Sequence, residues 1–197
     1  PPASVIIFLG IPGVQATEIR ITTNPADQTT PAIWENRIVW TDARDRNLAI
    51  YLYDIGTGIE TRIARGTKDR KYPAIWENLV AMEDTTQGSA DILAFDLVSQ
   101  TGRPIMTASA NQKFPRISGN YIVWETSRNG DNDIAVYDSS TGREVKLPAG
   151  SMSRRSPAIW EDRRNGNLDV YLYTISTGKE ERLTTDPADQ KSPAIWG

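Results

Sequence analysis

Three polar loops carry many of the side chains that could do chemistry in this chain. Aspartate and asparagine alternate along residues 42–47, 129–133 and 165–169. Such oxygen donors suit Ca²⁺, which takes about six to eight oxygen ligands, and Asp131, Asp133 and Asp169 are the candidate ligands. None of the loops has the EF-hand spacing or a closing bidentate glutamate. Because hairpin turns alone demand Asn-Gly and Asp at such places, the sequence favours turns without a cofactor over a calcium site.

The chain contains neither histidine nor cysteine. Histidine is the usual general base near neutral pH and the commonest metal ligand. Its absence excludes a Ser-His-Asp triad, a Cys-His pair and a His-ligated zinc site. Catalysis would have to use carboxylates such as Glu35, Glu77 or Glu161, and a hydrolase or lyase of that kind ranks third among the functions we consider. We therefore expect a protein that is not an enzyme.

The charge balance argues against a nucleic-acid partner, and the length of the apolar run argues against a membrane span. The 197 residues include 22 lysines and arginines and 25 aspartates and glutamates, for a net charge of −3. Nucleic-acid binding needs a clustered basic face, which this sequence lacks. The apolar run at residues 5–9 is far too short to span a bilayer. The sequence predicts no nucleic-acid partner and no membrane span.

The elements that position these side chains come from an internal repeat. The phrase Pro-Ala-Ile-Trp begins at residues 31, 73, 157 and 193, with a diverged copy at 115. The first four starts are 42 residues apart and the last step is 36. A period near 42 is typical of four-stranded propeller blades. We expect repeats over residues 17–197, with units that begin near these five positions.

Each unit reads as four short strands joined by turns. In the first unit the expected strands are residues 31–34, 37–40, 49–54 and 60–64. Alternation places Ile50 and Leu52 on one face of the third strand, and Tyr51 and Tyr53 on the other. Thr-Gly sequences at 57–58, 101–102 and 141–142 mark the last turn of each unit. Turn residues punctuate every hairpin and no helical period is sustained, so the chain is predicted to be all-β.

The fourth unit is shorter than the others. Trp160 is followed directly by a segment that matches residues 125–130 of the third unit. The six residues equivalent to 119–124 are missing. We expect this blade to lack its second strand.

Residues 1–16 do not belong to the repeat. Their apolar core consists of Val5, Ile6, Ile7, Phe8 and Leu9. One interpretation is the end of a secretory signal peptide, since residues 14–16 have the small side chains of a cleavage site. The other is a retained strand that docks on this chain or on a neighbour. We favour the retained strand.

The repeated pattern resembles the TolB-like β-propeller repeat of bacterial periplasmic proteins and of bacterial and archaeal surface proteins. The resemblance covers residues 18–197 and rests on the Pro, aromatic, Asp and Thr-Gly positions that the units share in order. It implies a propeller of four-stranded blades, about four to five here, incomplete at the ends. It also implies a location in the periplasm, at the cell surface or outside the cell. The phrase Pro-Ala-Ile-Trp would form the innermost strand.

Incomplete blades suggest how such a chain could act. Open sheet edges recruit strands from elsewhere. The predicted open-end residues are Ile19 and Ile21 at one end and Ile195 and Trp196 at the other, with residues 5–9 as the donor strand. We expect a non-enzymatic extracellular scaffold that assembles with like chains into a closed oligomer or a filament.

The alternative is a monomeric binding module that recognises a protein or a glycan at its rim. Glycan binding would use exposed tryptophans, and the chain has six: Trp34, Trp40, Trp76, Trp124, Trp160 and Trp196. Five of them recur at equivalent strand positions of the repeat. An aromatic side chain that recurs in this way is more often part of the core.

Overall fold

The computed structural model describes residues 19–86, 88–105, 111–128, 131–145, 154–155, 159–162, 165–174 and 177–190. The predicted donor strand at residues 5–9 and the predicted terminal residues Ile195 and Trp196 lie outside this part of the chain. The described residues form sixteen strands and no helix, which confirms the all-β prediction. No helix that could cross a membrane occurs among them.

The strands form four antiparallel sheets of four strands, which we call blades 1 to 4. Blade 1 contains β1 (Gln28–Trp34), β2 (Arg37–Asp42), β3 (Ala49–Asp54) and β4 (Ile59–Ile63). Blade 2 contains β5 (Arg70–Trp76), β6 (Leu79–Asp84), β7 (Asp91–Asp96) and β8 (Thr101–Pro104). Blade 3 contains β9 (Gln112–Ser118), β10 (Tyr121–Arg128), β11 (Asp131–Asp138) and β12 (Arg143–Val145). Blade 4 contains β13 (Arg154–Arg155), β14 (Ile159–Asp162), β15 (Asp169–Thr174) and β16 (Lys179–Arg182).

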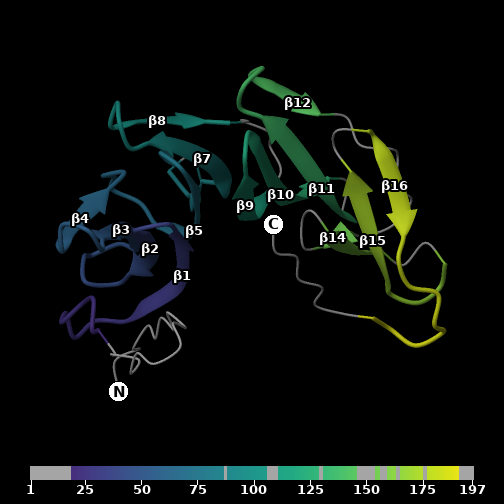
Figure 1. Ribbon diagram of the computed structural model, residues 1–197, viewed down its shortest axis with the longest axis horizontal. Helices are drawn as coiled ribbons and strands as arrows, with labels where there is room; N and C mark the ends of the chain where they lie inside the picture. The colour runs from purple at the N-terminus through teal and green to yellow at the C-terminus, as the bar shows by residue number, and fades with distance from the viewer. Residues whose placement is uncertain are drawn as a thin grey trace, which may run out of the picture.

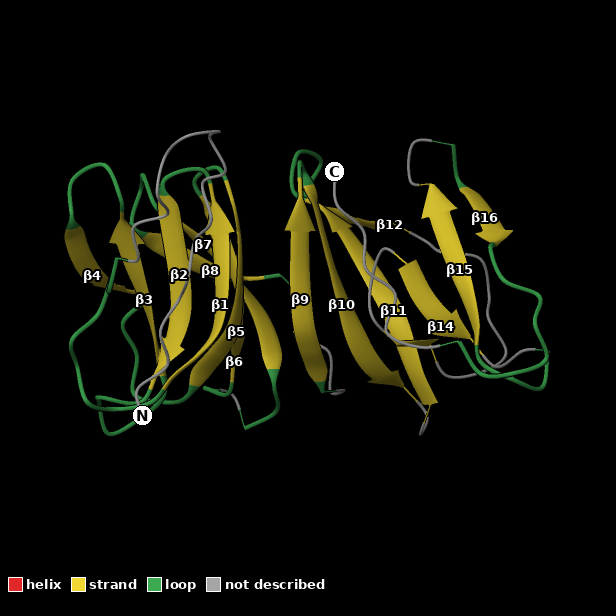
Figure 2. Ribbon diagram, turned by 60° about the horizontal axis from the view of Figure 1, so that its bottom comes forward, coloured by secondary structure: helices red, strands yellow, loops and turns green. Residues whose placement is uncertain are grey.

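The blades follow one another in an arc (Figure 1). On the inside the first strand β1 contacts β5, and β5 contacts β9, while the fourth strands lie on the periphery. Loops and turns join the strands at both ends (Figure 2). This is the arrangement of propeller blades around an axis. The Pro-Ala-Ile-Trp phrase lies in the inner strand of blades 1 and 2, as predicted, whereas in blade 4 its last two residues lie in β14.

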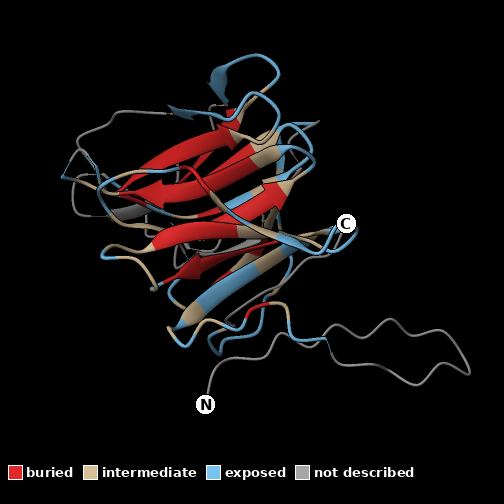
Figure 3. Ribbon diagram, turned by 90° about the vertical axis from the view of Figure 1, so that its left-hand side faces the viewer, coloured by how far each residue is buried: buried red, intermediate tan, exposed pale blue. Residues whose placement is uncertain are grey.

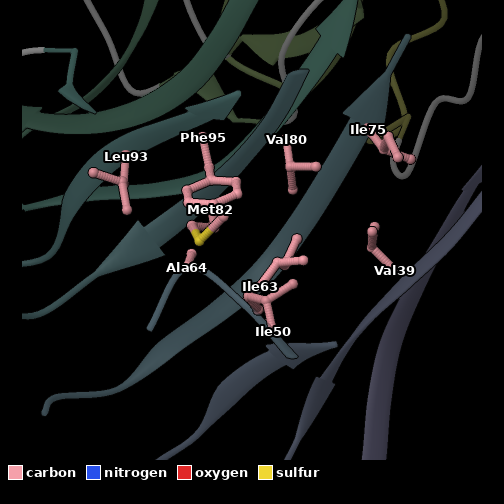
Figure 4. Packing of buried hydrophobic residues seen from close by; sticks show 9 residues of the cluster. All are labelled: Val39, Ile50, Ile63, Ala64, Ile75, Val80, Met82, Leu93 and Phe95. Atoms are coloured by element: carbon pink, nitrogen blue, oxygen red, sulfur yellow. The ribbon is translucent and has the colours of Figure 1, made fainter. Parts of the chain in front are cut away.

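Apolar side chains fill the space between blades. Each sheet has a leading face, which packs on the next blade, and a trailing face, which packs on the preceding one. Ile50 on the leading face of blade 1 meets Val80, Met82 and Phe95 on the trailing face of blade 2 (Figure 4). A second cluster joins blades 2 and 3, and a third joins blades 3 and 4. The central strands are consequently buried while the connecting loops are exposed (Figure 3).

The turn between the third and fourth strands is built in the same way in blades 1 and 3. Oδ1 of Asp54 accepts a hydrogen bond of 2.9 Å from the backbone NH of Thr57. Gly58 follows with φ of 70°, and Gly142 in blade 3 has φ of 71°. Glycine is favoured here because a side chain makes this left-handed conformation costly.

Blade 2 departs from the predicted turn. Gln100, with φ of 57°, occupies the position that Gly58 holds in blade 1. Gly102, predicted to lie in the turn, instead belongs to β8 and pairs with Phe95. The Thr-Gly match therefore placed this turn two residues too late, because the strand pairing and not the dipeptide sets its position.

Blade 4 also corrects a prediction, since it retains a second strand. Trp160 pairs with Tyr171 just as Trp40 pairs with Tyr51 in blade 1, so β14 occupies the second-strand position. The inner strand is instead shortened to β13. The six-residue deletion removes the middle of this hairpin. With β14 in place, β15 is hydrogen-bonded on both sides. Without β14, the backbone groups along one edge of β15 would lose their hydrogen-bond partners.

The longest hairpin lies in blade 3, where a loop was predicted at residues 129–133. Arg128 pairs with Asp131, so the ladder of β10 and β11 continues almost to the turn. The calcium candidates Asp131 and Asp133 therefore lie in a strand rather than in a loop.

Candidate functional site

Adjacent blades are joined by a hydrogen-bonded bridge in the linker that precedes each inner strand. At the first junction, the NH of Leu48 in blade 1 donates to Oδ1 of Asp69 at 2.9 Å. The NH of Arg70 donates to the carbonyl of Leu48, also at 2.9 Å. The carbonyl of Asp69 accepts from the NH of Thr85 in blade 2 at 3.1 Å. Asp69 thus ties two blades together, one through its side chain and the other through its backbone.

The bridge recurs along the chain. At the second junction, the NH of Ala90 donates to Oδ1 of Asn111 at 3.2 Å, and the carbonyl of Asn111 accepts from Ser127. On blade 4, the NH of Leu168 donates to Oδ1 of Asp189 at 2.8 Å. Taken one at a time, these residues are polar linker positions and give no sign of a bridge. The 42-residue spacing of Asp69 and Asn111 was the signal that could have identified them as bridges.

Asp27 is the first member of this series, and its bridge is half formed. Its carbonyl accepts from the NH of Ala43 at 3.0 Å, as the carbonyl of Asp69 does from Thr85. Its carboxylate is exposed and has no hydrogen-bond partner among the residues that the structure describes. Blade 1 therefore presents an acceptor of the type that Asp69 uses to hold the preceding blade.

The trailing face of blade 1 is apolar and partly covered. Ile38, Trp40 and Tyr51 are buried on it. Ile21 packs against them, at the repeat position that Ile63 occupies between blades 1 and 2. Residues 19–24 form no strand, and Ile19 is 62% exposed. Of the two predicted open-end residues at this end, the structure brings only Ile21 to the face.

Ile33 identifies the uncovered part of the same face. Ile33 and Ile75 hold equivalent positions in the inner strands of blades 1 and 2. Ile75 is 6% exposed because it packs on blade 1, whereas Ile33 is 50% exposed. At the far end of the described array, Val170 and Leu172 lie half-buried on the leading face of blade 4. These two faces are of the kinds that meet at every interior junction.

Charged and aromatic side chains gather around Arg44 at the trailing face of blade 1. Arg44 donates to Asp42 at 2.7 Å, pairs with Glu60 and lies 4.0 Å from the ring centroid of Tyr51. Trp40 Nε1 donates to the same aspartate at 2.9 Å. Burial alone would raise the pKa of Asp42, but the hydrogen bonds from Arg44 and Trp40 outweigh it and hold that pKa below its usual range. The cluster is a neutralised structural network.

Two of the three calcium candidates, Asp133 and Asp169, are engaged by the protein itself. Asp169 is fully buried and accepts from Arg182 at 2.6 Å, with the amides of Asn165 and Asn167 at 3.4 Å. Oδ1 of Asp133 accepts from the NH of Ile134 at 2.8 Å. No group of three acidic side chains suited to a metal occurs in the described part of the chain. What the structure brings together at Asp169 is an ion pair.

A lysine in the inner strand lies opposite a glutamate in the second strand, a pairing that sequence reasoning did not identify. Lys71 Nζ lies 3.8 Å from Oε2 of Glu83, which is 1% exposed. Burial raises the pKa of Glu83, opposed by a hydrogen bond from the NH of Phe114 and by the Lys71 charge. The backbone register repeats the pairing as Lys113 opposite Glu125. A basic residue twelve positions before a glutamate was the available signal.

The tryptophans and the turn glutamates have structural positions. Trp40 and Trp124 are 2% and 1% exposed, and Trp34 packs on Trp76 across the first junction with ring centroids 6.1 Å apart. Trp40 and Trp124 belong to the core, as predicted, whereas Trp34 and Trp76 are half-buried. Glu35 and Glu77, the suggested acids, lie at the tips of inner hairpins with φ of 47° and 50°. They are about one blade apart rather than paired.

Comparison with known proteins defines the fold. No family model matches the chain, and no curated protein does. Among solved structures, TolB from Acinetobacter baumannii matches with a TM-score of 0.62 and 19% identity over 86% of this chain and 46% of its own. A putative TolB from Agrobacterium tumefaciens matches with a TM-score of 0.65 and 15% identity, over 87% and 71%. This chain spans about half the length of the Acinetobacter protein.

Propeller domains of proteases match as well. The β-propeller domain of the Trilobed protease from Pyrococcus furiosus, described as having an open velcro topology, gives a TM-score of 0.62 and 12% identity over 81% of this chain and 57% of its own. The chain therefore has a TolB-like β-propeller fold, and the identities are low enough that the likeness concerns the fold alone.

Proposed function

We propose that this chain is a non-enzymatic structural scaffold, working in the periplasm or outside the cell, that assembles with further copies of itself through its blade faces. The observation that carries the proposal is the contrast between Ile33 and Ile75, which are 50% and 6% exposed at equivalent positions. Exposed apolar sheet faces favour association. The leading face of blade 4 on a second copy would offer Ile33 an apolar face at the repeat position that blade 1 offers to Ile75, and head-to-tail contacts of this kind give rings or filaments.

The mass of the native particle tests this proposal. We expect light scattering to give a multiple of the 21.9 kDa chain mass, with rings or filaments in negative stain. Ile33→Asp should return the particle to a single chain because it places a charge in the interface. Val98→Asp is the matched control, since Val98 is 74% exposed but lies in a turn of blade 2. A wild-type chain that stays monomeric at high concentration overturns the proposal.

A monomeric module that binds a protein or glycan at its rim is the second candidate. The cations of the inner strands favour it, since Lys71 is partly exposed and Lys113 is exposed. An acidic partner would use both, and Lys71→Glu with Lys113→Glu should abolish its binding without changing the particle mass. Retained binding in this variant would remove the inner strands from consideration.

A further inference from the structure

Residues 22–28 and 184–190 are two copies of one segment, identical at six of seven positions. The same two local hydrogen bonds shape both copies: Ala26 NH to Asn24 Oδ1 at 2.9 Å and the Gln28 amide to the Ala26 carbonyl in the first, Ala188 NH to Asp186 Oδ1 at 2.8 Å and the Gln190 amide to the Ala188 carbonyl in the second. The single difference, Asn24 for Asp186, preserves this turn because both side chains offer Oδ1. The two segments therefore share one conformation.

The second copy is held on blade 4 by Asn167 and Leu168, which we call the blade-4 linker site (the yellow end of Figure 1). The NH of Leu168 donates to the Asp189 carboxylate at 2.8 Å, and its carbonyl accepts from the NH of Gln190 at 2.7 Å. Nδ2 of Asn167 donates to two carbonyls of the segment, at 2.9 and 3.0 Å. With Asn167 and Leu168 the segment uses only backbone atoms apart from the Asp189 carboxylate, and beside them Oγ1 of Thr184 accepts from the NH of Val170 at 2.9 Å.

The first copy carries every group that this site uses. Asp27 corresponds to Asp189, and its carboxylate is exposed without a hydrogen-bond partner among the described residues. Its carbonyl already accepts from Ala43 of blade 1. Asp27 could therefore join blade 1 of its own chain to blade 4 of another, in the way that Asp69 joins blades 1 and 2.

We propose that residues 22–28 of a second copy bind the blade-4 linker site of the first by displacing residues 184–190. Blade 1 of the second copy then follows blade 4, with Ile33 over the half-buried Val170 and Leu172. This inference rests on the proposed self-assembly and names the segment that mediates it. Because the two segments compete for one site, the chain's own copy limits assembly.

Three full-length variants test the exchange by sedimentation over a range of concentrations. Asp189→Ala removes the carboxylate that holds the chain's own segment, so self-association should strengthen about tenfold, the effect of losing one hydrogen bond to a charged acceptor in the competing state. Adding Asp27→Ala should cancel the gain, since the incoming segment then lacks the same carboxylate. Asn111→Ala is the control, because it weakens an interior bridge and should lower thermal stability without strengthening association.

The outcomes separate this inference from the proposed function. Assembly of wild type with no gain in Asp189→Ala, or a gain that survives Asp27→Ala, overturns segment exchange and leaves assembly through the blade faces intact. Monomers throughout overturn both. A monomeric wild type with Asp27-dependent assembly of Asp189→Ala supports exchange and overturns assembly of the unaltered chain. Should Asp189→Ala fail to fold, Asp189→Asn keeps an acceptor and must show a smaller gain.

Discussion

Oε1 of Glu83, in blade 2, accepts a hydrogen bond of 2.8 Å from the backbone NH of Phe114, in blade 3. Phe114 has φ of 54° and lies where the register of β9 shifts against β10. At the preceding junction, Oγ1 of Thr41 accepts from the NH of Tyr72 at 3.1 Å, and Tyr72 has φ of 52°. A side-chain acceptor on the second strand thus fixes the bulge of the next inner strand.

Substitution of Glu83 should separate its charge from its role as an acceptor. The folded state raises the pKa of Glu83, so stability falls as the pH rises from the unfolded pKa of a glutamate to this higher value. Glu83→Gln keeps a hydrogen-bond acceptor but has no charge. It should therefore remove the loss of stability with rising pH, and the variant should be at least as stable as the wild type at neutral pH. Glu83→Ala should cost about 2 kcal/mol because the Phe114 NH loses its partner. Urea unfolding across pH measures both, and equal losses for the two variants would contradict this account.

Ile75 and Ile33 provide a matched test of blade packing. Ile75→Ala should destabilise the chain by about 3 kcal/mol, because it leaves a cavity between blades 1 and 2. Ile33→Ala should cost less than about 1 kcal/mol in dilute, monomeric protein, since half of that side chain is already exposed. Denaturant unfolding of both variants measures the difference. A similar cost at the two positions would mean that Ile33 is covered in the monomer.

Much of this fold is predictable from the repeat. The 42-residue period and the alternation in residues 49–54 give the strand order and assign Ile50 and Tyr51 to opposite faces, as the core clusters confirm. These features follow from local pattern, because a strand with one set of apolar side chains toward each neighbour has one register that buries them.

What sequence could not give depends on pairing and on tertiary position. The deletion near Trp160 can be aligned with either strand of the hairpin, and only the pairing of Trp160 with Tyr171 decides between them. Sequence reasoning placed the turn at Gly102 and not at Gln100, because Thr101 and Gly102 match the Thr-Gly motif although Gly102 lies in a strand. The bridging role of Asp69 needs two blades to be in place, so its residue type alone does not indicate it.

Replacement of Gln100 by glycine should stabilise the protein slightly. Its φ of 57° lies in the left-handed region, where blades 1 and 3 have glycine. Gln100→Gly should stabilise the protein by about 0.5 kcal/mol, reduced by loss of the 2.7 Å hydrogen bond from its amide to the Leu97 carbonyl. Gly142→Ala is the reciprocal change and should destabilise by about 1 kcal/mol. Thermal unfolding measures both, and a stabilised Gly142→Ala would refute the strain argument.

Asp42 should control the acid sensitivity of blade 1. Its folded pKa is lowered, so its contribution is complete above the unfolded pKa of an aspartate and is lost as the pH falls through the lower, folded value. Asp42→Asn should cost about 2 kcal/mol at neutral pH, because Arg44 loses one of its two carboxylate partners and keeps only Glu60 in a partly buried site. The gap between variant and wild type should narrow in acid. Unfolding at several pH values checks this, with Glu181→Gln as an exposed control, and a constant gap would exclude the ion pair as its origin.

Calcium should have no effect on stability if Asp169 serves as an ion pair. A cation at this carboxylate would have to displace Arg182, which lies 2.6 Å away, and would find amides in place of further acids. A ligand that binds only the folded state raises the melting temperature with its concentration. We expect thermal unfolding to be the same in EDTA and in millimolar CaCl₂, while Asp169→Asn lowers the melting temperature in both. A rise with calcium that Asp169→Asn abolishes would instead establish a metal site at this carboxylate.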